Sequence, residues 1–313
     1  MRVIGYGVCG KEANRYLRET LEEFKRLCDE TVICLNNATQ AEKDMINEYG
    51  FYWYEDNREW GKNQHIIKQD LLDNYVSELK PDWCICLDMD ETFANFERKD
   101  ITSIEEYADA LYVFIVNLWD EGWSREWSFW NIRVWKWGYN TDIRRQPLHC
   151  GLAPEWTYHY GVYSPYVLIH SGLKERKDRQ KKIERYEKYD PKAQYKDKAF
   201  YNALKEDKSD PFNKEEVVSL IKNEWLTKNK PIKKKTFMTN KPSEKIVYMR
   251  RLSDGALLDI PERHVPQALK NGMVLIESRE EKVEKKEEEP LVCDCGFTAK
   301  TAFGLTVHKR KHV

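Results

Sequence analysis

The sequence predicts an α/β protein with a mostly parallel sheet flanked by helices, and two observations carry that prediction. Short apolar runs alternate with amphipathic segments through the first half of the chain. Such alternation is typical of parallel strands joined by right-handed helical crossovers. The second observation is an unbroken apolar run, residues 84–87, followed at once by the carboxylates of Asp88, Asp90 and Glu91. A run of this kind fits a strand that is buried on both faces.

The elements of the first half follow from the spacing of apolar residues. Glycines at Gly7 and Gly10 predict a turn after the first strand, and the second strand ends abruptly at Asn36 and Asn37. Apolar positions three and four residues apart predict the helices. The expected elements are, in order, strand 2–6, helix 13–27, strand 31–35, helix 41–49, strand 51–54 and helix 64–79.

The second half is marked by a strand at 112–116 and then by an unusual density of tryptophan. These rings either fill a core of antiparallel strands or stack on a sugar or a base. The residues are Trp119, Trp123, Trp127, Trp130, Trp135 and Trp137. Residues 172–189 predict a strongly charged, solvated helix, and residues 217–225 predict one more helix.

Beyond this point the chain looks modular. We expect a large domain over 1–227, a lysine-rich linker over 228–245 and a small α+β unit over 246–277. In that unit, residues 253–255 predict a hairpin turn and residues 265–270 a short helix. A charged spacer, 278–290, then leads to a terminal module over 291–313.

Composition limits the classes of function. The 313-residue chain is 41% hydrophobic, enough for a sizeable core, and its formal net charge of −1 gives no global attraction to nucleic acid or to anionic membranes. No stretch reaches the roughly 18 apolar residues of a membrane span, and the chain opens with a strand rather than a signal peptide. We therefore expect a cytoplasmic protein without membrane contact. Cys34, Cys84 and Cys86 lie in expected core strands, which argues against a disulfide framework.

The acidic run at 88–91 is the first candidate site. Ligands of open α/β sheets bind at the carboxyl ends of strands, where Asp88 and Asp90 would emerge. Clustered carboxylates raise one another's pKa unless a cation neutralises them. Ligands that are all oxygen suit Mg²⁺ or Mn²⁺, usually together with a diphosphate. The alternative is a loop of solvated acids that caps a following helix.

The end of the chain carries a second candidate metal site. Cys293 and Cys295 are followed after twelve residues by His308, and His312 lies one helical turn later. Two thiolates and two imidazoles are the ligands of tetrahedral structural Zn²⁺. The segment resembles a Cys-Cys-His-His zinc finger, except that one residue, not two or more, separates the cysteines. Its few basic residues predict a weak, salt-sensitive contact with nucleic acid or protein.

Residues 1–204 resemble a family 2-type glycosyltransferase of GT-A fold, in a branch met in bacteriophage and bacterial genomes. The likeness rests on residues 7–17, 29–35, 87–91 and 148–151, together with 168–172. It implies a Rossmann-like GT-A sheet, a hexosyltransferase-like activity and a nucleotide-sugar donor. In the family the second strand usually ends in acidic residues that touch the nucleoside. Here Asn36 and Asn37 stand there, and their amides can still bind a base or ribose.

The resemblance also implies roles for single residues. Asp90 and His170 would hold Mg²⁺ or Mn²⁺ on the donor diphosphate, and Asp88 would contact the ribose or the metal. The remaining donor contacts are expected at Gly7, Asn36, Asn37, Lys68 and Lys174, although the two lysines also fit plain solvated charges. A carboxylate would remove the proton of the acceptor hydroxyl in an inverting displacement. Asp120 and Glu121 are the first candidates for that base, and Asp142 is the third.

Two other classes of function stay open. The same carboxylates suit a metal-dependent nucleotidyltransferase or phosphotransferase. Alternatively, the chain is a nucleic-acid-binding or DNA-modifying phage protein guided by its terminal module, working in the host cytoplasm. The acceptor of a glycosyltransferase would be a glycan, a protein or a modified DNA base.

Overall fold

The computed structural model describes residues 1–10, 15–144, 146–194, 201–202, 204–205 and 209–228, together with five short strands beyond them. The chain divides into two compact units, Met1–Lys233 with Leu291–Val313 and Lys234–Pro290. Among the described residues, no helix is long and apolar enough to cross a membrane.

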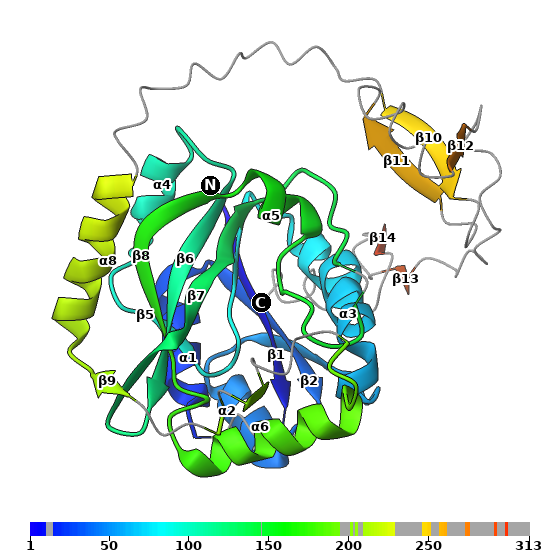
Figure 1. The fold of residues 1–313 in the computed structure, drawn as a ribbon. Helices are drawn as coiled ribbons and strands as arrows, with labels where there is room; N and C mark the ends of the chain where they lie inside the picture. The colour runs from blue at the N-terminus through cyan, green and yellow to red at the C-terminus, as the bar shows by residue number, and fades with distance from the viewer. Residues whose placement is uncertain are drawn as a thin grey trace. The chain divides into compact units, whose positions relative to one another are not determined.

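The larger unit is an α/β structure whose sheet has a parallel half and a mixed half (Figure 1). The described strand order is β3-β2-β1-β4-β7-β6-β8-β5, and β9 also pairs with β7. The first four of these strands are parallel, as the alternation of strands and helices predicted. They are β1 (Val3–Gly10), β2 (Glu30–Asn36), β3 (Tyr52–Glu55) and β4 (Trp83–Cys86).

The tryptophan-rich region forms the mixed half. β7 lies antiparallel to both β4 and β6, while β8 runs parallel to β6 and antiparallel to β5. Four of the six tryptophans are buried, so the interpretation of these rings as core residues of antiparallel strands is confirmed. The strands are β5 (Glu91–Phe93), β6 (Ala110–Trp119), β7 (Gly122–Lys136), β8 (Val162–His170) and β9 (Asp210–Pro211).

The helices cover the sheet, and several begin or end away from the expected positions. The helix expected at 64–79 begins at Trp60 and continues from Leu71 into a π turn and a 3₁₀ turn. The charged helix expected at 172–189 begins at Arg176, because a turn occupies residues 171–174. The helices are α1 (Leu17–Leu27), α2 (Gln40–Glu48), α3 (Trp60–Leu71), α4 (Asp100–Ile104), α5 (Glu155–Tyr160), α6 (Arg176–Tyr189) and α8 (Lys214–Lys228).

Two apolar layers enclose the central strand β4. Trp83 and Ile85 pack into the layer that contains α1, and Cys84 and Cys86 pack into the layer that contains α3. Both faces of β4 are therefore buried, which explains why its sequence is an unbroken apolar run rather than an alternating one. This burial fixes the point at which the acidic residues 88–91 leave the sheet.

The cysteines of the sheet are free thiols, as their positions in core strands predicted. Those of β1, β2 and β4 are buried, and burial raises the pKa of the Cys34 and Cys86 thiols to about 12. They therefore stay neutral at physiological pH and act as small apolar side chains.

The described strands of the smaller unit form a three-stranded antiparallel sheet in the order β11-β10-β12. They are β10 (Ile246–Arg251), β11 (Leu257–Pro261) and β12 (Met273–Leu275), and all three fall within the expected unit 246–277. β13 (Leu291–Val292) and β14 (Thr298–Ala299), outside this unit, form a two-stranded antiparallel sheet. The expected turn 253–255, the helix 265–270 and the ligands Cys293, Cys295, His308 and His312 lie outside the described residues.

Residues 87–90, which connect β4 to β5, are called the acidic loop. β1 approaches this loop so closely at Gly7 that only glycine fits there. A Cβ at Gly7 would overlap the carbonyl oxygen of Leu87 and the methyl group of Met89, whereas a Cβ at Gly10 would lie 3.6 Å from the nearest atom, the carbonyl oxygen of Asn36. We expect Gly7→Ala to lower the free energy of unfolding by about 1–3 kcal/mol through overpacking. Gly10→Ala is the control on the same strand and should change it little. Urea unfolding measures both, and equal losses in the two variants would contradict the close packing at Gly7.

Candidate active site

The sheet register brings the acidic run to the late histidine. The chain leaves β4 at Cys86 and enters β5 at Glu91, which pairs with His170 on β8. The other neighbour of His170 is Asn117, on β6. The two segments that the glycosyltransferase resemblance placed in one site, 87–91 and 168–172, therefore lie side by side. Because a strand follows the acidic loop, the alternative of a loop capping the next helix is wrong.

A buried arginine neutralises part of the acidic cluster. The guanidinium of Arg133, on β7, donates to Glu91 through Nε and Nη2, at 2.7 and 2.6 Å. The side chains of Arg133 and Glu91 are only 4% and 1% exposed. The same Nη2 lies 3.2 Å from Oδ2 of Asp88, whose side chain is 47% exposed. Part of the cationic charge that the acidic run requires is therefore supplied by the protein.

Sequence reasoning missed Arg133. A lone cation within the run Ile132–Trp135 of a buried strand was the available signal, because an isolated charge in an apolar strand needs a partner. The partner could not be named, since Arg133 and Glu91 are 42 positions apart. Burial raises the pKa of Glu91 above its usual value, and the nearby guanidinium opposes that shift.

Asp90 and His170 form the second pair of the site. Oδ2 of Asp90 lies 3.4 Å from Nε2 of His170. Burial acts to raise the pKa of Asp90, but the charge and hydrogen bond of His170 outweigh it and hold that pKa at about 2. The Asp90 side chain is still 27% exposed, so an ionised carboxylate oxygen remains accessible from outside.

Gly172 makes room for this pair. A Cβ at Gly172 would overlap the Asp90 carboxylate and lie 3.1 Å from Nε2 of His170. The backbone N–H of Ser171 donates to the carbonyl oxygen of Asp90, at 2.9 Å. The residues His170, Ser171 and Gly172 thus each have a separate contact with the acidic loop.

Asn36 and Asn37 close the end of β2. The Asn36 amide donates to the carbonyl oxygens of Asp56 and Arg58, at 2.7 and 2.9 Å, and thereby holds the loop after β3. Asn37 adopts a left-handed conformation, with φ of 57°, and its amide faces Oδ1 of Asn36 at 3.4 Å. Both protons of the Asn36 amide are thus engaged within the protein, a role that sequence reasoning did not assign.

Lys68 and Lys174 lie in contrasting surroundings. Lys68, on α3, is buried; its ammonium donates to the carbonyl oxygen of Cys150 at 2.6 Å and lies 5.2 Å from the Trp60 ring centroid. No carboxylate in the described ranges forms an ion pair with it. Lys174 is exposed on the turn that leads into α6. The interpretation of Lys68 as a solvated charge is therefore wrong, whereas it fits Lys174.

The three candidate bases occupy two different places. Asp120 and Glu121 form the turn between β6 and β7, and the Asp120 carboxylate accepts from Nη2 of Arg179 at 3.1 and 3.2 Å. Glu121 is exposed. Asp142 accepts from the Asn140 amide and lines a separate hollow beside α3, together with Gln69 and Asp73.

Backbone hydrogen bonds connect Asp120 to the acidic loop. Ser171 donates to Asp90, Lys174 donates to Ser171 at 3.0 Å, and Asp120 donates to Lys174 at 2.7 Å. This chain of contacts ties the end of β6 to the loop through the turn 171–174. Asp120 and Glu121 are thereby joined to the Asp90 region, whereas the backbone contact of Asp142 within the described ranges is with Glu155.

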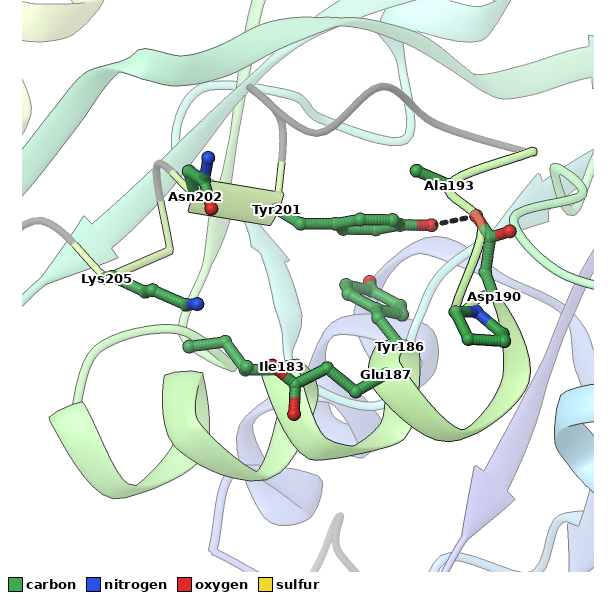
Figure 2. A pocket seen from close by; sticks show the side chains of 9 residues that line it. Ile183, Tyr186, Glu187, Asp190, Ala193, Tyr201, Asn202 and Lys205 are labelled. Atoms are coloured by element: carbon green, nitrogen blue, oxygen red, sulfur yellow. Dashed lines mark hydrogen bonds between the residues drawn. The ribbon is translucent and has the colours of Figure 1, made fainter.

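A hollow of about 180 Å³ lies on α6, away from the predicted residues (Figure 2). The Tyr201 hydroxyl donates to Asp190 across it, and the Tyr186 ring lies beneath Tyr201 with 4.9 Å between ring centroids. None of the predicted donor, metal or base residues lines this hollow.

Asp90 and His170, with Asp88 two residues away, would form an incomplete set of ligands for a divalent cation, which a substrate would have to complete. Within the described ranges, no three His, Cys, Asp or Glu side chains are gathered closely enough to hold a metal by themselves. Mg²⁺ usually keeps several waters and binds through one or two carboxylates plus substrate phosphates. Two accessible carboxylates and one imidazole nitrogen are consistent with that mode.

Comparison with known proteins adds similarities to solved structures only. No protein-family model matches the chain, and no curated protein matches its sequence. S. aureus TarS is 16% identical over 40% of this chain and 23% of its own, with a TM-score of 0.31. A CMP:2-keto-3-deoxy-manno-octonic acid synthetase complexed with CTP is 8% identical over 37% of this chain and 53% of its own, with a TM-score of 0.27.

A third structure, 4-diphosphocytidyl-2C-methyl-D-erythritol synthase, is 12% identical over 43% of this chain and 74% of its own, with a TM-score of 0.28. The chain thus spans about a quarter and about half of the first two proteins. Because every one of these alignments covers less than half of the chain, the α/β assignment rests on the strand order itself.

The Arg133–Glu91 pair should dominate the stability of the site. We expect Arg133→Met to lower the free energy of unfolding by about 3–5 kcal/mol, because it leaves a buried carboxylate without a counter-ion. The double variant Arg133→Met/Glu91→Leu should recover most of that loss. Lys136→Met, on the same strand, breaks a more exposed pair with Glu105 and should cost less than about 1 kcal/mol. Urea unfolding tests all three, and an Arg133→Met loss no larger than that of Lys136→Met would contradict the assignment.

Proposed function

We propose that the chain is a metal-dependent glycosyltransferase that moves a sugar from a nucleotide-sugar donor to an acceptor hydroxyl by inverting displacement. The observation that carries the proposal is the Asp90–His170 pair beside Asp88, where the central strand β4 ends. Asp90 is ionised and partly exposed, so it is available to a cation. The likeness of residues 87–91 and 168–172 to the family adds support, because the sheet brings these segments together.

Each residue of the site has a distinct part in this proposal. Asp90 and His170 are the ligands of Mn²⁺ or Mg²⁺, and Asp88 contacts the ribose or the metal with the oxygen that Arg133 leaves open. The cation would neutralise negative charge on the departing nucleoside diphosphate. Gly7 allows β1 to approach the acidic loop closely. Lys68 and Lys174 are the candidate phosphate contacts. Lys68 is the stronger candidate, because its buried ammonium lacks a carboxylate partner in the described ranges.

The acceptor side of the proposal rests on Asp120. Its backbone belongs to the hydrogen-bonded path from Asp90 through residues 171–174. Its carboxylate is also partly exposed beside Arg179, which leaves it accessible to a hydroxyl group. Glu121 on the same turn is the second candidate, and Asp142 stays third because it lies in a separate hollow.

The terminal module, residues 291–313, bears on which acceptor the enzyme would use. We propose that Cys293, Cys295, His308 and His312 bind Zn²⁺ and that residues 291–313 make a weak contact with nucleic acid or protein. The acceptor is then a glycan, a protein or a modified DNA base.

Donor binding tests the metal-dependent part of the proposal. We expect one of the UDP-, GDP- or dTDP-sugars to raise the melting temperature only with Mn²⁺, and Asp90→Ala to abolish the shift. Saturation near 100 times Kd would stabilise the fold by about 2.7 kcal/mol. Asp109→Ala is the matched control, because that carboxylate binds Tyr139 instead and should leave the shift intact. Turnover of nucleoside triphosphates, with no effect of any sugar donor, would indicate a nucleotidyltransferase instead.

Turnover of the base variants tests the acceptor side. We expect Asp120→Asn to lower kcat by about 10²–10⁴-fold, the usual loss when a general base is removed. The donor-induced shift in melting temperature should survive, because this substitution leaves the metal ligands in place. Glu121→Gln and Asp142→Asn should each stay within about tenfold of wild type on the same scale. A large loss of kcat in Glu121→Gln alone would transfer the role to Glu121.

A further inference from the structure

Asn117 is the buried neighbour of His170 on β6. Its Oδ1 lies 2.5 Å from Nδ1 of His170, and its Nδ2 donates to the carbonyl oxygen of Trp127 at 2.5 Å. Its backbone N–H faces Oγ of Ser128 at 3.2 Å. Asn117 is therefore held at three points by the β6–β7 hairpin and by β8.

These contacts determine which way round the Asn117 amide lies. The Trp127 carbonyl oxygen only accepts hydrogen bonds, so the NH₂ group of Asn117 must face it. The oxygen of the amide then faces the ring of His170. Because that oxygen also only accepts, Nδ1 of His170 must carry a proton.

The position of that proton decides what the other ring nitrogen offers. A neutral imidazole has one N–H, so a proton on Nδ1 leaves a lone pair on Nε2. Nε2 is the nitrogen that lies 3.4 Å from Oδ2 of Asp90. Gly172 packs against the same nitrogen and leaves no room for a side chain there. When the ring carries two protons, Nε2–H donates to Asp90, which is the contact that lowers the pKa of that carboxyl. When the ring is neutral, the Nε2 lone pair is directed to the place where Asp90 offers a carboxylate oxygen.

We propose that Asn117 is a positioning residue that fixes His170 as the Nδ1–H tautomer and so presents Nε2 to a divalent cation beside Asp90. The metal part of this inference rests on the proposed function, whereas the tautomer is a property of the metal-free protein. Histidine ligands commonly donate their second N–H to a protein acceptor, and losing that acceptor typically weakens metal affinity about 10–100-fold.

Nitrogen NMR of the metal-free protein tests the tautomer directly. With ¹⁵N-labelled histidine, the spectrum is recorded at a pH high enough that the ring carries a single proton, as the two ring-nitrogen signals themselves show. We expect His170 to show a protonated Nδ1 and an unprotonated Nε2, with the signal identified by its loss in His170→Gln. A protonated Nε2 in wild type overturns the inference.

Three variants separate positioning from general destabilisation. Asn117→Leu removes the acceptor, so the neutral His170 ring should no longer be held with its proton on Nδ1. The affinity for Mn²⁺, measured by electron paramagnetic resonance, should fall about 10–100-fold. Asn117→Asp keeps an acceptor toward Nδ1 and should preserve both properties, although it loses the donor to Trp127. Ser128→Ala removes the contact with the Asn117 backbone and the hydrogen bond to the Ser124 carbonyl oxygen but leaves the Asn117 amide intact, so it serves as the matched control in the same hairpin.

The outcomes distinguish this inference from the proposed function. An Nδ1–H tautomer that survives Asn117→Leu overturns the role of Asn117, whatever the metal does. A tautomer lost in Asn117→Leu and kept in Asn117→Asp and Ser128→Ala supports that role. If wild type then fails to bind Mn²⁺, the tautomer assignment stands and the metal site of the proposed function is wrong.

Discussion

The buried contact between Arg133 and Glu91 is the interaction on which the rest of the site depends. β5 pairs with β8 at the edge of the sheet and not with β4, although only the acidic loop separates β4 from β5 in sequence. Arg133 comes from β7, which pairs with β4, and it reaches both the start of β5 and the side chain of Asp88. Without this guanidinium, the turn from β4 into β5 would enclose an uncompensated carboxylate, which is among the most costly arrangements in a protein interior.

The three acids of the loop therefore have different surroundings despite their closeness in sequence. Glu91 is fully enclosed and engaged with Arg133, so it serves the fold. Asp90 is paired with an imidazole and retains an accessible oxygen. Asp88 is half-exposed, and its Oδ2 lies 3.2 Å from Nη2 of Arg133. The cluster thus keeps a surplus of negative charge only on its outer side, which is where a cationic or metal-bound ligand would meet it.

The local sequence pattern predicted the strands and the acidic loop, which depend on neighbouring residues. It missed the contacts between side chains on paired strands. Unbroken apolar runs placed β2 and β4, and the acids after Leu87 placed the loop correctly. The pattern could not reveal that β7 inserts antiparallel beside β4, because that pairing joins residues about 50 positions apart. Arg133 and Asn117 were missed for the same reason, since each meets its partner only through the register of β7 or β8. The contact of the Asn36 amide with the loop after β3 was missed as well, because residue spacing does not encode it.

The buried cysteines of the central strands allow local opening of the sheet to be measured chemically. An alkylating reagent attacks the thiolate, and the raised pKa of Cys34 and Cys86 keeps both thiols protonated while the strands are packed. Their modification then requires local separation of the sheet, so its rate follows the free energy of that opening rather than surface exposure. Cys86 stands two residues before Asp88, and its alkylation rate would therefore report how firmly the strand beneath the acidic loop is held.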